Sequence, residues 1–198
     1  MPSPRLFVLL SLPLLSLAAD CPTSLLPFRT SNVQAGVFSE SRLSGFFYEQ
    51  SYKDLAQIGA SCQTMNVTST PDLGKSGSVF NVDFAVKYGR IPFTINELYT
   101  PLPGAEGEDN TGSYVKTVDM PGGDLLKIPL VVVDATIDKE TGLYDSFTMY
   151  GCFAGGDELY FVTRGKERDE VKLQNMYDVA RGVGIKFEDE DLNVVESC

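Results

Sequence analysis

The sequence predicts an all-β domain of about eight consecutive strands, followed by one α-helix. Three observations predict it. Apolar and polar residues alternate with period two through the middle of the chain, turn-forming residues separate these runs, and one amphipathic segment follows the last run. Many short strands joined in sequence order are typical of a β-sandwich or a β-barrel.

The clearest strand is expected over residues 80–88, "FNVDFAVKY". Successive side chains of a strand point to opposite faces, so one apolar face is formed by Phe80, Val82, Phe84, Val86 and Tyr88. Residues 61–68, "SCQTMNVT", alternate as well. If Asn66 faces outward, Cys62 does too, and the inward side chains are Gln63, Met65 and Val67.

Further strands are expected over residues 45–52, 91–100, 112–120, 127–137, 144–153 and 157–164. Their proposed inward side chains include Phe93, Ile95, Tyr99, Phe147 and Met149. A helix is expected over residues 169–182 because Leu173, Met176, Tyr177 and Ala180 recur at helical spacing, with Asp169 as the expected N-cap. A single helix after the last strand has to lie against the outside of the sheet.

Residues 1–19 predict a secretory signal peptide. Arg5 precedes an apolar run over residues 6–17, and the small residues Ala18 and Ala19 follow it. The run is shorter than the roughly 20 residues that cross a bilayer, which disfavours a membrane anchor. We therefore expect cleavage near Ala19, a single domain over residues 20–198, and a secreted protein without a transmembrane span.

The charge of the chain argues against nucleic-acid binding. Its formal net charge is -11, and removal of Arg5 with the signal peptide would change this to -12. So much negative charge repels phosphate backbones, and no cluster of lysine and arginine residues offsets it.

The four cysteines predict two disulfides. Cys21, Cys62, Cys152 and Cys198 are widely spaced, and the chain has no histidine, so the close ligand pairs of a zinc site are missing. Four cysteines allow three pairings, and composition does not choose among them. Asn66-Val67-Thr68 is a sequon, which makes Asn66 a candidate for glycosylation. We expect no metal and no cofactor.

Four segments together resemble the lipocalin family, and within it the apolipoprotein D-like subgroup. They are "FSESRLSGFFYE" (38–49), "CQTMNVT" (62–68), "YDSFTMYGC" (144–152) and "LYFVTRG" (159–165). The chain departs from the family pattern at two places. Phe47 stands where the family has a signature tryptophan, and Gly142-Leu143 stand where a Thr-Asp pair is usual.

The resemblance implies an eight-stranded antiparallel up-and-down β-barrel with the C-terminal helix packed outside and a tail over residues 185–198. It implies that Gly45, Phe47 and Arg164 close one end of the barrel, with Phe47 under the Arg164 guanidinium as a cation–π pair. It also implies the disulfides Cys21–Cys152 and Cys62–Cys198. Both arms are expected to lack regular structure, so the bridges would hold them to the barrel wall.

The resemblance further implies a carrier, because an eight-stranded barrel is just wide enough for one small ligand. A lipid, a retinoid or carotenoid, a sterol or a tetrapyrrole would suit an interior that is apolar apart from a few phenolic hydroxyls. The expected ligand-binding residues are Met65, Val67, Val82, Phe84, Val86, Tyr88, Phe93, Ile95, Tyr99, Phe147 and Met149. We expect a monomer that is able to make peripheral contact with a membrane.

The alternative function is a lipocalin-type enzyme, such as an isomerase or a de-epoxidase, acting on a lipophilic substrate. The absence of histidine removes the commonest general base, and paired cysteines leave no thiol nucleophile. An inward carboxylate could serve instead, and Glu97 is a candidate if the parity of its strand shifts. We therefore expect no catalytic residue. A module that binds partners through its open-end loops is a third alternative.

Overall fold

The computed structural model describes residues 21–70, 79–103, 106–153, 156–195 and 198. The predicted signal peptide, residues 1–19, lies outside the described residues. The strands are β1 (Gly45–Lys53), β2 (Ala60–Ser69), β3 (Phe80–Tyr88), β4 (Ile91–Pro101), β5 (Ser113–Val118), β6 (Ile128–Ile137), β7 (Tyr144–Phe153), β8 (Gly156–Thr163) and β9 (Asn193–Val194). The helices are α1 (Glu170–Gly182) and the short 3₁₀ turns η1 (Leu26–Phe28), η2 (Glu40–Leu43), η3 (Leu55–Gln57), η5 (Gly123–Leu125) and η6 (Asp189–Asp191).

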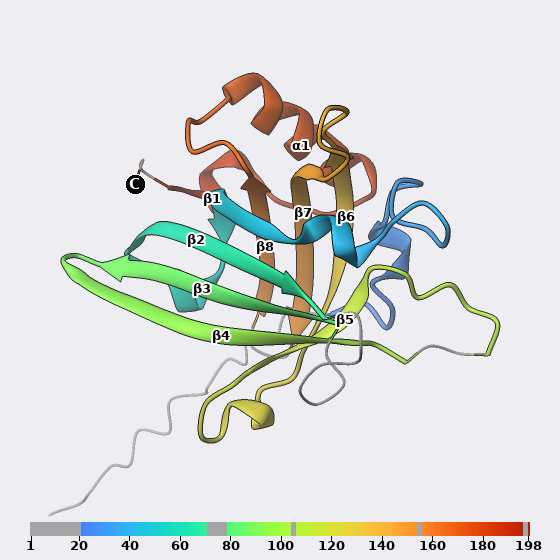
Figure 1. Ribbon diagram of the computed structural model, residues 1–198, viewed down its shortest axis with the longest axis horizontal. Coiled ribbons are helices and arrows are strands. Elements are labelled where there is room, and N and C mark those ends of the chain that lie inside the picture. Colours follow the sequence, from blue (N-terminus) through green and yellow to red (C-terminus); the bar gives the residue numbers. More distant parts are fainter. Residues whose placement is uncertain (1–20, 71–78, 104–105, 154–155, 196–197) are drawn as a thin grey trace, which may run out of the picture.

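The first eight strands form a closed antiparallel barrel (Figure 1). Strands β2 to β8 pair in sequence order, and β1 pairs with both β2 and β8, which joins the two edges of the sheet. Pairing in sequence order is the up-and-down arrangement, and closure removes exposed edges. The predicted fold class is therefore confirmed: an all-β, eight-stranded antiparallel barrel with one helix outside it.

The alternating sequences form strands because each has one face inside the barrel. In β3 the even-numbered residues from Phe80 to Val86 are buried, whereas Asp83 is exposed. Strand β4 pairs with β3 in a register that places Val86 opposite Phe93. Side chains from neighbouring strands thus meet inside the barrel, which fixes the register.

A second apolar core lies outside the barrel, beneath α1. The helix carries Leu173, Tyr177 and Ala180 on its buried face, and it lies outside the strands in Figure 1. Their partners on the outer face of the barrel include Val131, Val133, Leu159 and Phe161. This second layer explains why residues 128–137 are almost continuously apolar. Strand β6 is buried on both faces.

The closed end of the barrel is built around Phe47. Its side chain is fully buried and meets Phe147 edge to face, with ring centroids 4.9 Å apart. The Arg164 guanidinium carbon lies 4.1 Å from the centre of the Phe47 ring. Arg164 also donates hydrogen bonds to the backbone carbonyls of Tyr144 (2.6 Å) and Ser44 (2.8 Å), which hold the guanidinium over the ring.

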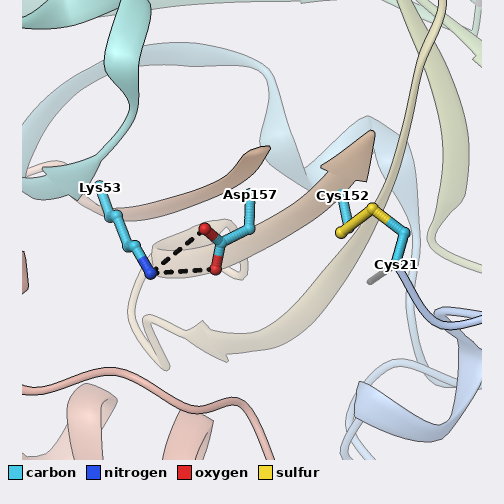
Figure 2. Close-up of a disulfide and its surroundings, with 4 residues drawn as sticks. All are labelled: Cys21, Lys53, Cys152 and Asp157. Atoms are coloured by element: carbon cyan, nitrogen blue, oxygen red, sulfur yellow. Dashed lines mark hydrogen bonds and ion pairs between the residues drawn. A yellow bond between two sulfur atoms is a disulfide. The ribbon is translucent and has the colours of Figure 1, made fainter. Parts of the chain in front are cut away.

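The two disulfides join Cys21 to Cys152 and Cys62 to Cys198, and no cysteine is free. Figure 2 shows the first of them, which ties the N-terminal arm to β7. In the same view Lys53 pairs with Asp157, linking the end of β1 to the start of β8 at 3.2 Å.

The C-terminal tail has more regular structure than expected. Strand β9 pairs antiparallel with β1, with Val194 opposite Ser51, so the tail adds two residues to the sheet before it reaches Cys198. The expectation that both arms lack regular structure is thus wrong for this one. Cys62, the disulfide partner of Cys198, lies at an irregularity in β2 and has a backbone φ of +55°, which is rare outside glycine.

No helix among the described residues is long and apolar enough to cross a membrane.

Candidate ligand-binding cavity

A cavity of about 550 Å³ occupies the half of the barrel that lies away from Phe47. It opens to the outside at the end of the barrel opposite Phe47. Its wall comes from β3, β4, β5 and β6, and η3 and the start of β8 complete it. The apolar part of the wall contains Leu55, Phe84, Val86, Phe93, Ile95, Val118, Met120, Leu126, Ile128 and Phe153. The size lies within the range of pockets that enclose small organic ligands.

Five of the residues expected to bind a ligand line this cavity. They are Phe84, Val86, Tyr88, Phe93 and Ile95. Tyr88 and Phe93 lie at the rim, where 39% and 50% of their surfaces are exposed. The Tyr88 hydroxyl donates a hydrogen bond to the Ala56 carbonyl at 3.0 Å and thereby links the β3 end to η3.

The other six expected residues are buried away from the cavity wall. They are Met65, Val67, Val82, Tyr99, Phe147 and Met149. Aromatic packing fills this half of the barrel, since Phe80 stacks on Tyr99 with centroids 4.4 Å apart and Phe147 contacts Phe47. Alternation predicts which side chains face inward but not how far the closed end is filled.

The floor of the cavity is charged. Lys116 on β5 donates a hydrogen bond to Glu158 on β8 at 2.7 Å and another to the Tyr160 hydroxyl at 3.1 Å. Its ammonium also lies 3.8 Å from Glu97 on β4. Lys116, Glu97 and Glu158 all line the cavity and are almost completely buried. Three strands thus bring one cation and two carboxylates to the same place.

Two tyrosines behind the cavity wall, and an aspartate that lines it, contact the charged groups of this floor. Tyr99 donates a hydrogen bond to Glu97 at 2.7 Å. The Tyr160 oxygen lies 2.6 Å from Glu158 and 3.1 Å from Asp54, and its single proton serves one carboxylate at a time. Asp54 also caps η3 by accepting a hydrogen bond from the Ala56 backbone at 2.8 Å.

Glu49 on β1 belongs to the same cluster, although it does not line the cavity. Only 1% of its surface is exposed, and neither carboxylate oxygen has a hydrogen-bond partner among the described residues. Burial raises the pKa of the Glu49 carboxyl well above its usual value. The charges of Asp54 and Glu97 raise it further, whereas the charge of Lys116 and the neighbouring Gln57 side chain lower it.

The other charged groups shift in directions that follow from their neighbours. Burial acts to lower the pKa of the Lys116 ammonium, but the charges of Glu97 and Glu158 outweigh it, so this pKa is raised. Burial raises the pKa of Glu158, against the opposing charge of Lys116. Burial and nearby carboxylates raise the pKa of Tyr160 well above its usual value, so its hydroxyl stays protonated at neutral pH.

The expectation of an interior with only phenolic polar groups is corrected by this floor. Glu97 faces inward with no shift in strand parity, because it shares a face with Ile95 and Tyr99 in regular pairing with β3. The inward position of Glu97 could have been predicted from the sequence, because Glu97 alternates in step with Ile95 and Tyr99. Glu49, Lys116 and Glu158 likewise lie two residues from an inward aromatic side chain, and no inward position was predicted for them.

The four other predicted positions are placed as follows. Asn66 is exposed on β2, where its neighbour Val67 is buried. Gly45 has a backbone φ of +114°, and a Cβ atom there would lie 2.7 Å from Arg164 Nη1. Gly45, Phe47 and Arg164 therefore meet at the closed end. Among the described residues, no three histidine, cysteine or acidic side chains are arranged to hold a metal ion.

No model of a protein family matches the sequence, and no curated protein matches it. Solved structures do match the fold. Insecticyanin from the tobacco hornworm Manduca sexta has a TM-score of 0.60 and 11% identity, over 81% of this chain and 82% of that chain. Lobster apocrustacyanin A1 has a TM-score of 0.58 and 12% identity, over 79% and 78%.

The siderocalin Ex-FABP also matches, with a TM-score of 0.53 and 10% identity, over 80% of this chain and 92% of that chain. All three are lipocalins. At these identities the likeness shows the architecture, and the chain has the lipocalin fold.

Proposed function

We propose that the protein is a lipocalin that carries a small, largely apolar molecule in its barrel. The observation that carries this proposal is the cavity of about 550 Å³, open at one end and walled by Phe84, Val86, Phe93 and Ile95. The other end is filled by Phe47 and its neighbours, so a ligand enters and leaves by one route. Burial of the apolar part of a ligand there is worth about 25 cal/mol per Å².

Two findings support a carrier in particular. The siderocalin that shares the fold is described as functioning through dual ligand specificities, so this barrel architecture supports ligand binding. The four cysteines are all paired, so no thiol nucleophile is present. The finer assignment to the apolipoprotein D-like subgroup is supported by the disulfide pattern, in which each arm is tied to a different strand.

The proposal includes secretion through the signal peptide of residues 1–19, glycosylation at Asn66 and action as a monomer. Two disulfides are typical of proteins that fold in oxidising compartments. Asn66 is exposed, as a glycan acceptor has to be. Exposed apolar side chains line the cavity at its rim, namely Leu55, Phe93, Met120 and Leu126, which supports brief contact with a membrane surface during ligand transfer.

Titration with fluorescent lipophiles tests the carrier function. The chain has nine tyrosines and no tryptophan, so a bound ligand should quench tyrosine emission and saturate near one site per chain. Val86→Asp should abolish binding because it places a charge on the apolar wall. Val171→Asp, on the exposed face of α1, is the matched control and should bind normally. Absence of saturable binding across alcohols, acids, amines and isoprenoids would refute the proposal.

The enzymatic alternative depends on Glu97, which meets the positional requirement for a general base facing the cavity. A carrier returns its ligand unchanged, whereas an isomerase or de-epoxidase does not. Chromatography and mass spectrometry of the ligand recovered after incubation separate the two functions. We expect an unchanged ligand.

A further inference from the structure

The charged floor contains more negative than positive groups. Asp54, Glu97 and Glu158 line the cavity, and Glu49 lies beside them in the barrel. Lys116 is the only cation that the described residues contribute to this floor. Without counting Glu49, three carboxylates in the cavity lining face one ammonium group. An unbalanced buried charge is destabilising, so it calls for a compensating partner.

Hydrogen-bond acceptors also outnumber donors at the floor. Gln57 lines the cavity and is 5% exposed, and its side-chain oxygen has no hydrogen-bond partner among the described residues. Both oxygens of Glu49 lack partners as well. Tyr160 has one proton for two carboxylates, Glu158 and Asp54. In the cavity lining, Gln57 therefore has an unused acceptor, and Glu158 and Asp54 share a single donor. A ligand that carries donors would satisfy these groups.

The walls above this floor are apolar. Phe84, Val86 and Ile95 line the cavity between the exposed rim and Glu97. Glu97 pairs with Val82, two residues along β3 from Phe84 and further from the rim. A molecule that fills the cavity thus meets hydrocarbon along its length and carboxylates at its inner end. The arrangement matches an amphiphile with its polar group inserted first.

We propose that the ligand is a lipophilic amine, whose protonated amino group binds the carboxylates at the floor while its apolar body fills the cavity. This proposal rests on the carrier function and specifies its ligand class. An ammonium group brings both the positive charge and the donors that the floor lacks. A carboxylate in the same place would face Glu97 and Asp54 and be repelled. Fatty acids should therefore be poor ligands.

Three probes of equal chain length test the ligand class: dodecylamine, dodecanol and dodecanoate. Each is titrated below its micellar concentration at pH 7 against the full mature protein, by calorimetry or by displacement of a neutral fluorescent lipophile. We expect dodecylamine to bind at least about tenfold more tightly than dodecanol, equivalent to ~1.4 kcal/mol. Dodecanoate should bind most weakly.

Glu97→Gln tests the origin of this preference. It keeps the size of the side chain and an oxygen that accepts the Tyr99 hydrogen bond, but removes the charge. Its affinity for dodecylamine should fall to near that for dodecanol. An unchanged dodecanol affinity shows that the variant is folded. Glu140→Gln, on the exposed β6–β7 connection, is the charge-matched control and should behave like the wild type.

Two results would overturn the amine proposal while leaving the carrier function intact. One is binding of dodecanol or dodecanoate as tight as that of dodecylamine. The other is a full amine preference in Glu97→Gln. If none of the three probes and no other lipophile binds, both proposals fail together.

Discussion

At the scale of single residues, the buried Glu49 side chain lowers the stability of the folded barrel. It is a carboxyl group on the inner face of a β-barrel, 1% exposed, with both oxygens unpartnered among the described residues. Leaving a buried polar group unsatisfied costs about 1–3 kcal/mol. Polar groups that reduce stability are common at functional sites, where a ligand supplies what the fold does not.

Glu49→Gln should stabilise the protein at neutral pH, because a neutral amide is buried with neither a negative charge nor the uptake of a proton. The folded pKa of Glu49 is raised, so the folded state binds its proton more tightly than the unfolded state does. Wild-type stability contributed by this group thus falls as pH rises from the usual glutamate value toward the raised one. Glu49→Gln has no ionisable group at this position, so its stability should not fall with pH for this reason.

Urea denaturation of Glu49→Gln and wild type at pH 4 and pH 8 checks this difference. The gap between the two proteins should widen with pH, whereas Glu140→Gln, an exposed control, should follow the wild type at both values. A variant that is less stable than the wild type at pH 8 would contradict the account of Glu49 as an unpaired group.

Gly45 shows a second constraint at this scale. Its φ of +114° disfavours any side chain, and a Cβ atom there would lie only 2.7 Å from Arg164 Nη1. The guanidinium has little freedom to move, because two backbone carbonyls and the Phe47 ring hold it.

Gly45→Ala should therefore lower the free energy of unfolding by more than Gly59→Ala does. Gly59 has a φ of +78° with no atom within 4 Å of its Cβ position, so the control isolates the backbone contribution of about 1–2 kcal/mol. Gly45→Ala adds the displacement of Arg164. Equal losses in chemical denaturation would show that Arg164 adapts without cost.

At the scale of elements, helix α1 depends on its first turn. The Asp169 side chain accepts a hydrogen bond from the Lys172 backbone at 3.0 Å, and its charge faces the positive end of the helix dipole. The helix covers the outer core between Leu173 and Phe161. Fraying of this turn would expose that core to water.

Asp169→Ala should lower the free energy of unfolding by about 1 kcal/mol, within the 0.5–2 kcal/mol range for lost N-caps. Asn175→Ala, exposed in the middle of the same helix, is the control and should be neutral or slightly stabilising because alanine is the better helix former. Thermal unfolding followed by far-ultraviolet circular dichroism separates the two. A neutral Asp169→Ala would show that packing alone holds the helix.

The sequence predicts strands better than it predicts the depth of the cavity. Period-two alternation locates β3 because each residue alternates between two environments, and the run over residues 128–137 fits a strand covered on both faces. The cavity floor could not be predicted in the same way. Charged residues usually face water, so Glu97 was expected inward only if its strand parity shifted, and no inward position was predicted for Lys116.

At the scale of the whole molecule, closure of the barrel could be predicted only through the family resemblance. Alternation alone is equally compatible with a sandwich. The local sequence of β1 does not specify that this strand pairs with both β2 and β8. The same holds for the cysteines. Their number predicts two bridges, but which strand meets which arm depends on the folded topology.

The bridge between Cys62 and Cys198 connects residues 136 apart in sequence and holds the tail across the outside of the barrel. In the chain-entropy model a loop of this length contributes at most about 5 kcal/mol, and measured values are usually about 2–4 kcal/mol. When the bridge is lost, the tail keeps the β9 pairing with β1 and the packing of Phe187 and Leu192 in the outer core. Neither cysteine lines the cavity.

The double variant Cys62→Ala/Cys198→Ala should therefore lose about 2–4 kcal/mol of unfolding free energy yet keep its affinity for dodecanol. Denaturation and probe titration on the same sample measure the two quantities independently. Glu97→Gln is the counterpart, because it should change amine binding at little cost in stability. If removal of the bridge abolished dodecanol binding in a protein that remains folded, the tail would contribute to ligand binding and not only to the stability of the barrel.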